Sequence, residues 1–456
     1  MSRLRIGIFG HYGNRNLGDE AITAAVARAI RRHLPGAEIV GLSINPDDTA
    51  QRHGIAALPI RDIETPVAGA AAPRPAAPAG GTKPAAAAPA GIGFKQRLKR
   101  IPVVYWPLKA LARTWEGAGA LRREFGFLRA CYGRVKALDL LMISGSNQFL
   151  DNFGGPLGFP YTLFKWTLLA RLTGTPVAVL SVGAGPVASP VSKFLIRWVL
   201  SRVQYHSFRD RGSRALIAEI GYRGPTRVAP DLAFSLLTDR PPPRAAATAG
   251  RPVVGLNPMP VYDARYWPVA DPEKYDNYVA KLATFVGRLI EARYPVVLFS
   301  TQAKDALVID DIQARLTETA GGIPPGLRVS LSASVDALID TLSGLDAVVA
   351  TRFHGVLLPL LVERPVVGIC YQRKTRDLMD DMGQGGYALD LEGFEVEELW
   401  QCFVRLMERR EDETQRITDK KNAYVAALER QYREVFGLLD DGTGRARAPA
   451  APETRR

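Results

Sequence analysis

The feature that most constrains this chain is an alternation of short apolar runs with longer segments of helical periodicity. In the first half, strands are predicted at Leu4–Gly10, Glu38–Leu42, Leu138–Ser144, Val177–Val182 and Arg227–Pro230. The clearest helix between them is Asp19–Leu34, which is rich in alanine and carries apolar residues at helical spacing. Such alternation predicts a parallel sheet covered by crossover helices.

The same pattern restarts near residue 253. Strands are predicted there at Val253–Leu256, Val296–Ser300, Arg328–Leu331, Ala347–Thr351 and Val366–Cys370. Helices are predicted at Glu273–Arg293, Ala303–Thr319, Val335–Leu345 and Val356–Val362, and one or two long helices at Glu395–Phe436. Two halves with one architecture predict an α/β protein with two Rossmann-like domains facing across a cleft. Ligands of such sheets bind at the carboxyl ends of the strands.

Two stretches rich in alanine and proline interrupt this alternation. Residues 67–91 are almost all Ala, Pro and Gly. Such a composition cannot bury enough apolar surface to offset its ordering entropy, so we expect a disordered insertion inside the first domain. Residues 238–252 contain three consecutive prolines and are predicted to be the interdomain linker. The predicted domains are therefore 1–237 and 253–456.

The net charge of +13 raises the question of an anionic partner. The excess lies mainly in Lys95–Lys136 and Arg445–Arg456, without the aromatic interleaving typical of RNA-binding proteins, so no nucleic-acid partner is expected. Two interpretations of Lys95–Lys136 stay open. It forms a helix packed on its own domain, which we favour, or it makes peripheral contact with an anionic membrane.

Three features bear on where the protein works. The sequence shows no signal peptide and no apolar stretch of membrane-spanning length. Its three cysteines are far apart, which fits a reducing compartment. We therefore expect a cytoplasmic protein, with contact to the inner face of the membrane as the open alternative.

The strongest candidate for chemistry is Arg352-Phe353-His354-Gly355, which follows an all-apolar strand. An arginine, a titratable imidazole and the free N–H groups of a helix start would meet there at one anion-binding point. Lys374 lies just past the next strand and adds a second cation. Arg209, at a predicted strand end in the first half, can grip a carboxylate or phosphate with two hydrogen bonds. Its alternative role is a structural ion pair with Asp210 or Asp231.

Two polar loops in the first half are candidates for binding a hydroxyl-rich ligand. The loop Gly10–Glu20 has neither the dinucleotide fingerprint nor a P-loop lysine. Its candidate side chains are Asn14, Asn16, Asp19 and Glu20, although a plain turn is an equally good interpretation. The loop Ser144–Asn152 offers Asn147 and Asp151, with a simple strand exit as the alternative. No histidine or cysteine spacing indicates a metal, and no Gly-x-Ser-x-Gly motif indicates a nucleophilic serine, so we expect no metal and no cofactor.

Taken together, these residues resemble the polysaccharide pyruvyl transferase family. The match rests on Gly10–Glu20, Ser144–Asp151, Arg209-Asp210 with Ser213, Pro230-Asp231 with Phe234, and Arg352–Gly355 with Tyr371 and Lys374, in the family's order. The resemblance implies domains arranged as in GT-B glycosyltransferases. It implies phosphoenolpyruvate as donor substrate and, as acceptor, a sugar of a polysaccharide or of its lipid-linked oligosaccharide precursor.

The resemblance also implies roles for particular residues. Arg209, Arg352, His354 and Lys374 fall at the positions expected to hold or act on phosphoenolpyruvate. Ketal formation requires a proton to be delivered to the methylene carbon of the donor, and His354 is the best candidate general acid or base near neutral pH. The catalytic residues are therefore predicted to be His354 and Arg352, with the two polar loops on the acceptor side.

The chain departs from the family pattern where a glycine triplet is usual, because it carries Gly145-Ser146-Asn147. Two other functions also stay open. A GT-B glycosyltransferase using a nucleotide-sugar would hold a ribose with Glu363, nine residues after His354. A non-catalytic relative would only bind an acidic ligand, and the full set of cations and histidine argues against it.

Overall fold

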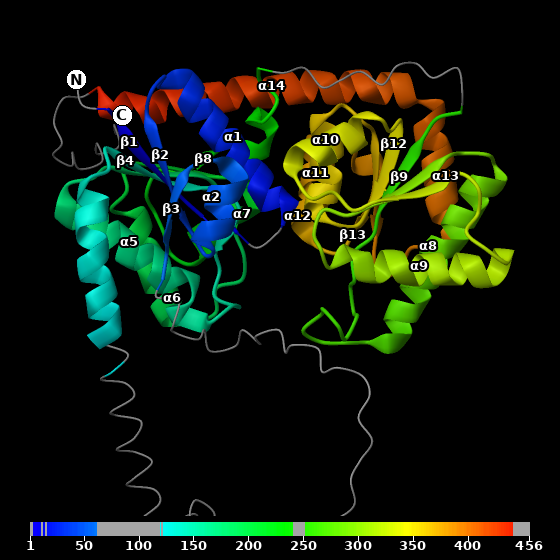
Figure 1. The fold of residues 1–456 in the computed structure, drawn as a ribbon, viewed down its shortest axis with the longest axis horizontal. Coiled ribbons are helices and arrows are strands. Elements are labelled where there is room, and N and C mark those ends of the chain that lie inside the picture. The colour runs from blue at the N-terminus through cyan, green and yellow to red at the C-terminus, as the bar shows by residue number, and fades with distance from the viewer. Residues whose placement is uncertain are drawn as a thin grey trace, which may run out of the picture.

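The computed structural model describes residues 3–10, 12–13, 16–61, 119, 122–239 and 251–440. The predicted insertion 67–91, residues 95–118 and most of the predicted linker 238–252 lie outside the described residues. The described chain forms two parallel sheets with helices on both faces (Figure 1). No helix within these ranges has the length and apolar character needed to span a membrane.

The first sheet has the order β3-β2-β1-β4-β6-β7-β8, and all of its neighbouring strands are parallel. Its strands are β1 (Arg5–Phe9), β2 (Glu38–Ser43), β3 (Ala56–Pro59), β4 (Leu140–Ser144), β6 (Val177–Ala184), β7 (Tyr205–Phe208) and β8 (Arg227–Val228), and a short β5 (Asn147–Phe149) pairs with β6. The strand order reverses between β1 and β4. Ligands of doubly wound sheets bind beside such a reversal, at the carboxyl ends of the strands.

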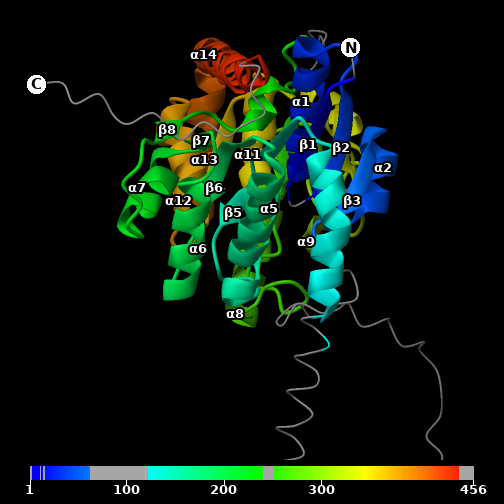
Figure 2. The same ribbon diagram turned by 90° about the vertical axis from the view of Figure 1, so that its left-hand side faces the viewer.

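The helices of the first half are α1 (Leu17–His33), α2 (Pro46–His53), one over residues 122–136, α5 (Phe159–Thr173), α6 (Pro190–Leu200) and α7 (Arg211–Glu219), with 3-10 turns η1 (Gly155–Leu157) and η2 (Leu232–Ser235). Successive side chains of a strand point to opposite faces of the sheet, so they show which helices cover which face. Ile6 and Ile8 pack with α1, whereas Phe9 packs in a separate cluster with α5 and α6. Figure 2 looks onto the second of these faces.

The second sheet has the order β11-β10-β9-β12-β13-β14 and is also parallel throughout. Its strands are β9 (Val254–Asn257), β10 (Val296–Phe299), β11 (Leu327–Ser330), β12 (Ala347–Ala350), β13 (Val366–Cys370) and β14 (Ala388–Asp390). Its helices are α8 (Pro272–Glu291), α9 (Asp305–Ala320), α10 (Val335–Ser343), α11 (Phe353–Leu361), α12 (Arg373–Asp381), α13 (Val396–Glu408) and α14 (Arg410–Phe436), with turns η3 (Gly385–Tyr387) and η4 (Gly437–Leu439). The predicted fold class of two Rossmann-like domains is confirmed.

The long helix α14 starts on the second half and runs back across the first (Figure 1). Near its end, the Gln431 amide oxygen accepts hydrogen bonds from Ser207 Oγ at 2.6 Å and from the Tyr205 hydroxyl at 3.2 Å. The amide nitrogen of the same side chain donates to Ser181 Oγ at 3.2 Å. Because Gln431 is buried, these bonds fasten the last helix to β6 and β7.

Candidate functional site

The first turn of α11 lies where the two halves meet. Arg352 is the residue before the helix, and Phe353 and His354 begin it, so the helix starts three residues earlier than the predicted Val356. A methyl group added at Gly18, in the first turn of α1, would lie 1.9 Å from His354 Nδ1. Only a residue without a side chain lets α1 and α11 approach this closely. The same junction is held by a hydrogen bond from Leu17 N to the Thr301 carbonyl, 2.9 Å long.

Arg352 is a buried cation with one unused donor. Its Nε pairs with Asp305 at the start of α9, and its guanidinium lies 5.3 Å from the ring centre of Tyr266. Burial lowers the pKa of Arg352, but Asp305 and Tyr266 more than offset this effect and raise the pKa above its ordinary value. Arg352 Nη2 is buried and finds no hydrogen-bond acceptor among the described residues. This donor is therefore free to bind an oxygen atom of a ligand or of water.

Arg209 follows β7 and reaches the same place from the first half. Its Nη2 donates to Asn147 Oδ1 at 3.1 Å, and its Nη1 is 3.4 Å from Asp231. Its Nε is 3.5 Å from Asp210, which is longer than a good hydrogen bond. Both ion pairs considered from the sequence therefore form. The guanidinium also stacks over Phe353, 4.6 Å from the ring centre, so it is held by both halves.

Lys374, in the first turn of α12, completes a group of three cations. Its Nζ is 5.3 Å from the ring centre of Phe353, so that ring is in cation–π contact with both Arg209 and Lys374. Burial and the neighbouring Arg209 lower the pKa of the Lys374 ammonium to about 8. Its charge is therefore retained at neutral pH and lost in mildly alkaline solution.

His354 is buried among these cations. Burial lowers the pKa of its imidazole well below the ordinary value, and Arg209, Lys374 and Arg352 lower it further. The imidazole is therefore neutral at pH 7. Its Nε2 has no hydrogen-bond partner among the described residues.

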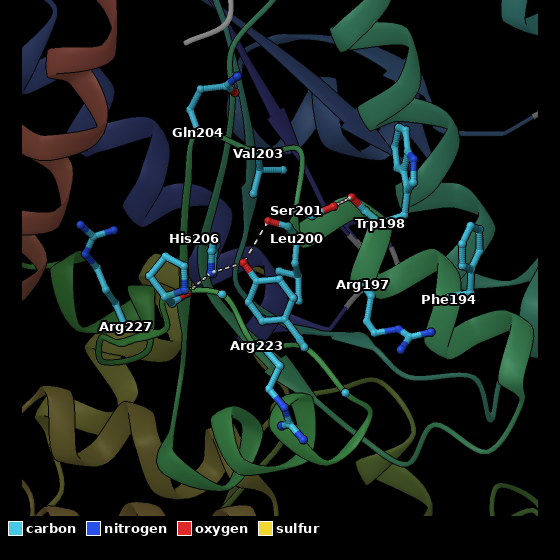
Figure 3. A pocket seen from close by; sticks show the side chains of 14 residues that line it. Phe194, Arg197, Trp198, Leu200, Ser201, Val203, Gln204, His206, Arg223 and Arg227 are labelled. Atoms are coloured by element: carbon cyan, nitrogen blue, oxygen red, sulfur yellow. Dashed lines mark hydrogen bonds between the residues drawn. The ribbon is translucent and has the colours of Figure 1, made fainter. Parts of the chain in front are cut away.

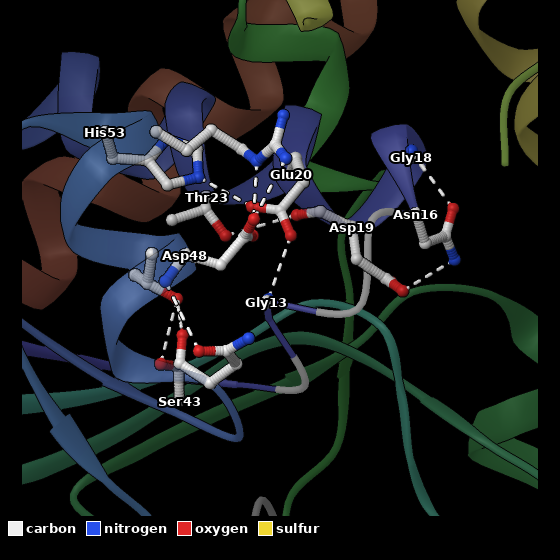
Figure 4. A network of polar contacts seen from close by, with 12 residues as sticks. Gly13, Asn16, Gly18, Asp19, Glu20, Thr23, Ser43, Asp48 and His53 are labelled. Atoms are coloured by element: carbon white, nitrogen blue, oxygen red, sulfur yellow. Dashed lines mark hydrogen bonds and ion pairs between the residues drawn. The ribbon is translucent and has the colours of Figure 1, made fainter. Parts of the chain in front are cut away.

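The start of α1 contributes two acidic residues with different environments (Figure 4). Glu20 is fully engaged, because it accepts a hydrogen bond from Gly13 N at 2.9 Å and pairs with His53 Nε2 at 2.7 Å. Asn16 caps the helix by accepting from Gly18 N, and it donates to Asp19 Oδ2 at 2.7 Å. Asn14, the remaining candidate of this loop, lies outside the described residues.

Asp19 has a protonation state that the sequence did not indicate. Burial raises the pKa of its carboxyl to about 7, a hydrogen bond from Ser146 and the charge of Lys374 act in the opposite direction, and Glu20 adds to the rise. Asp19 therefore holds a proton close to neutral pH while lying within the electrostatic reach of Lys374. Its place in the sequence gives no such signal, because an acidic residue in the first turn of a helix is usually a complement to the helix dipole.

The loop that departs from the family's glycine triplet contacts both parts of the site. Gly145 and Ser146 have positive φ angles of 55° and 54°, so Ser146 occupies a conformation that normally favours glycine. Its side chain hydrogen-bonds Asp19, and the next side chain, Asn147, accepts from Arg209. The two residues that replace glycine thus hold an acid and a cation of the site.

Two candidates from the sequence lie apart from this cluster. Asp151 accepts hydrogen bonds from Ala188 N at 3.1 Å and Ser189 N at 2.8 Å. Burial acts against these bonds but is outweighed, and the pKa of Asp151 falls below its ordinary value. Glu363, just past the carboxyl end of α11, pairs with Lys421 of α14. Both carboxylates are engaged in structural contacts.

The fold and the site define a two-domain α/β protein of the GT-B type. A glycosyltransferase from Rickettsia africae is similar over 97% of this chain and 100% of its own, with a TM-score of 0.54 and 7% identity. A UDP-GlcNAc 2-epimerase from Neisseria meningitidis, solved bound to UDP-GlcNAc, is similar over 95% of this chain and 99% of its own, with a TM-score of 0.51 and 11% identity. Likeness at such low identity shows the fold alone.

The sequence itself gives the narrower assignment. The family model described as polysaccharide pyruvyl transferase matches residues 16–373, which include Arg209, Arg352 and His354 and end at Arg373, the first residue of α12. The chain belongs to the polysaccharide pyruvyl transferase family. No curated protein matches the sequence significantly.

Proposed function

We propose that this protein transfers the pyruvyl group of phosphoenolpyruvate to two hydroxyls of a sugar, in a polysaccharide or its lipid-linked precursor. The observation that carries the proposal is the meeting of three cations and an imidazole around Phe353. Phosphoenolpyruvate carries a phosphate and a carboxylate on one small frame, and two anionic groups so close together need several fixed cations. The buried donors without acceptors on Arg209 and Arg352 are suited to its oxygens.

The reaction that we propose is balanced by two proton transfers. A proton adds to the methylene carbon of the donor, and the developing positive charge on the neighbouring carbon is attacked by the first sugar hydroxyl. The bond from that carbon to the phosphate oxygen breaks, and a second hydroxyl closes the ring. Of the two hydroxyl protons released, one replaces the proton used at the methylene carbon and the other leaves with phosphate.

The protonated carboxyl of Asp19 and the neutral imidazole of His354 support separate residues as the acid and the base of this reaction. The neutral His354 imidazole, with its free Nε2, is suited to take a proton from the attacking hydroxyl. Asp19 retains a proton near pH 7 and is suited to deliver it to the methylene carbon. Bound donor would also offset the nearby positive charge, which raises the pKa of His354 and lets it hold the proton it receives.

The test is phosphate release from phosphoenolpyruvate with a panel of sugar acceptors, with the ketal identified by NMR. His354→Ala is expected to lower turnover by about 10²–10⁴-fold, the usual effect of removing a positioned proton-transfer group, while the melting temperature stays close to that of the parent. Near-normal turnover in this variant would contradict the assigned role.

Melting temperatures measured with phosphoenolpyruvate and with nucleotide-sugars distinguish pyruvyl transfer from glycosyl transfer. We expect phosphoenolpyruvate to raise the melting temperature and nucleotide-sugars to leave it unchanged, because Glu363, the residue considered for a ribose, is paired with Lys421. Stabilisation by nucleotide-sugars alone would favour a glycosyltransferase. Binding of phosphoenolpyruvate without phosphate release from any acceptor would favour a non-catalytic relative.

A further inference from the structure

The outer face of the first half carries a charge pattern that the proposed reaction does not use. From residue 152 to residue 209 there is no Asp or Glu, although acidic residues make up 46 of the 456 residues of the chain. Arg171, Arg197 and Arg202 are exposed in the same stretch and Lys193 is partly exposed, whereas Lys165 and Arg209 are buried and pair with Glu124 and Asp231. The stretch includes η1, α5 and α6, so these three elements contribute surface cations but no carboxylates of their own.

Large apolar side chains are exposed on the same elements. Phe153 is 60% exposed, Leu157 in η1 is 79% exposed, and Val191 and Phe194 on α6 are 54% and 56% exposed. Phe125, on the neighbouring helix 122–136, is 68% exposed. We call these five residues the apolar edge. Monomeric proteins rarely gather exposed apolar side chains without an interaction to make there.

The elements that carry the apolar edge are neighbours in the structure. The turn η1 lies against both α5 and α6. The helix 122–136 is joined to the first turns of α5 because Glu124 accepts from the Tyr161 hydroxyl at 3.2 Å and pairs with Lys165 at 2.9 Å. Figure 2 shows these helices in a row on one face. Since α5 and α6 each follow a strand, their amino ends lie at the carboxyl edge of the sheet, the edge that also carries Arg209.

A basic cavity opens beside the apolar edge (Figure 3). It has a volume of about 540 Å³ and lies between α6 and residues 221–227. Arg197, Arg223 and Arg227 line it, Phe194 belongs to both the cavity and the apolar edge, and no Asp or Glu is among the lining residues. The other walls are largely apolar, with Trp198 and Tyr222 among them. Guanidinium groups beside apolar walls suit a phosphate that is attached to an apolar body.

We propose that this face docks the protein onto an anionic lipid bilayer, with the apolar edge in the interface and the arginines of the cavity near lipid phosphates. Charge complementarity favours this partner, because an anionic bilayer offers a negative surface to many cations at once and an apolar layer beneath it. The docking face runs along α6 from its amino end, at the carboxyl edge of the first sheet, to the cavity beside its carboxyl end. The proposal does not depend on the identity of the donor.

The test is cosedimentation of the full chain with vesicles of phosphatidylcholine alone and with added phosphatidylglycerol. We expect binding to the anionic vesicles that weakens as salt rises. The double variant Leu157→Ser, Phe194→Ser and the single variant Arg197→Glu should each bind at least about tenfold more weakly, the effect of about 1.4 kcal/mol. Melting temperatures and turnover on a water-soluble acceptor should stay at the parental level.

Matched controls come from the second half, where Val269 and Ile323 are 76% and 62% exposed. The variant Val269→Ser, Ile323→Ser and the variant Arg328→Glu should bind vesicles like the parent. Binding that is unchanged by the variants of the docking face would overturn the proposal, as would a parent chain that binds neither vesicle. Sedimentation velocity tests whether this face instead mediates self-association. A parental dimer that the same variants disrupt, with no effect on vesicle binding, would assign the face to self-association instead.

Discussion

Asp19 and His354 show how neighbouring groups of the site are kept in opposite protonation states. Burial disfavours the charged form of each, which raises the pKa of the carboxyl and lowers that of the imidazole. The cations around His354 strengthen its neutral state, while Glu20 strengthens the protonated state of Asp19. A carboxylic acid and a neutral base can therefore coexist in a site at pH 7, which is the arrangement that two coupled proton transfers require.

The first prediction concerns Asp19→Asn. Turnover is expected to fall by about 10²–10⁴-fold, because the amide cannot donate an acidic proton. The pKa of Asp19 is about 7 in the fold against an ordinary value of 3.8, so the folded state holds the extra proton between these values. Stability therefore decreases as pH rises from about 4 to 7, and the asparagine variant should lose that dependence. Melting temperatures at pH 5 and pH 8 check this, and parallel curves for parent and variant would contradict the assigned protonation.

The second prediction concerns Lys374 and the donor. Because the ammonium has a pKa of about 8, its charge disappears as pH rises through that value, and the affinity for an anionic donor should fall with it. The KM for phosphoenolpyruvate is expected to rise by about tenfold or more between pH 7 and pH 9.5, the loss of one charge-assisted hydrogen bond. Lys374→Arg stays charged throughout and should give a flat profile over this range. A parental KM that does not change with pH would refute this account.

At the scale of elements, the decisive contact is between the first turns of α1 and α11. Gly18 is the residue that lets these helices meet, and Gly355 plays a similar part on the other side, since a methyl group there would lie 1.9 Å from Asn257 Oδ1. The imidazole of His354 is thus placed by two helix starts and a strand end, none of which is adjacent in sequence. Its position depends on backbone proximity more than on its own hydrogen bonds.

The third prediction follows from this contact. Gly18→Ala introduces a methyl group that must displace His354 or separate the helices, and turnover is expected to fall by about 10²-fold, as when a reacting group is misplaced by about an ångström. Gly287→Ala is the matched control, because Gly287 lies in α8 with nothing within 4 Å of the added methyl group. Steady-state kinetics and melting curves of both variants make the comparison. Full activity of Gly18→Ala would show that this approach of the helices is dispensable.

Elements with a strong apolar stripe could be predicted from the sequence, and those without one could not. The strands β1, β2, β12 and β13 are found within about one residue of their predicted bounds, since continuous apolar runs mark buried parallel strands. The helix α2 was not predicted because only Thr49 of its residues is buried, and α12 buries only Thr375 and Met379. The short strands β3 and β14 were missed for a similar reason, because few residues carry the signal, and β7 was expected only as a strand that ends at Arg209.

The cationic residues of the site could be predicted from the sequence, but the protonated carboxyl group of Asp19 could not. Arg209, Arg352, His354 and Lys374 follow strands of two sheets, and the carboxyl ends of parallel strands are where ligands bind, so their convergence could be expected. The protonation of Asp19 depends on burial by a loop and a helix that come from distant parts of the chain. Sequence spacing carries no information about such burial. The engagement of Glu20 by His53 and of Asp151 by the backbone before α6 was hidden for the same reason.

At the scale of the whole molecule, α14 joins the two halves independently of the linker. Tyr205, Ser207 and Ser181 all hydrogen-bond to the Gln431 side chain, and Glu429 pairs with Arg32 and His33 of α1. One continuous apolar core runs from α1 through α14 into the second sheet. The cations of the site come from both halves, so this helix helps to fix the distances between them, on which the proposed donor binding depends.

The fourth prediction tests this attachment. Gln431→Leu leaves three buried hydroxyls without their amide partner, which is expected to lower the free energy of unfolding by about 1–3 kcal/mol. Arg430→Ala, at the exposed neighbouring position, should change it little. Urea denaturation followed by circular dichroism measures both. If the two variants unfold at the same urea concentration, α14 does not hold the halves together through this side chain.

The course of α14 has a consequence for the order in which the protein is made. A ribosome completes β6, β7 and α1 long before it reaches the residues that cover them, so the nascent first domain exposes the hydroxyls of Ser181 and Ser207 to water. The helix α14 can pack on the first domain only after the second domain has been translated. If the chain is divided between residues 239 and 251, the separate fragments should for this reason fold poorly. Mixing them should restore folding, because the second fragment supplies the helix α14 that packs on the first.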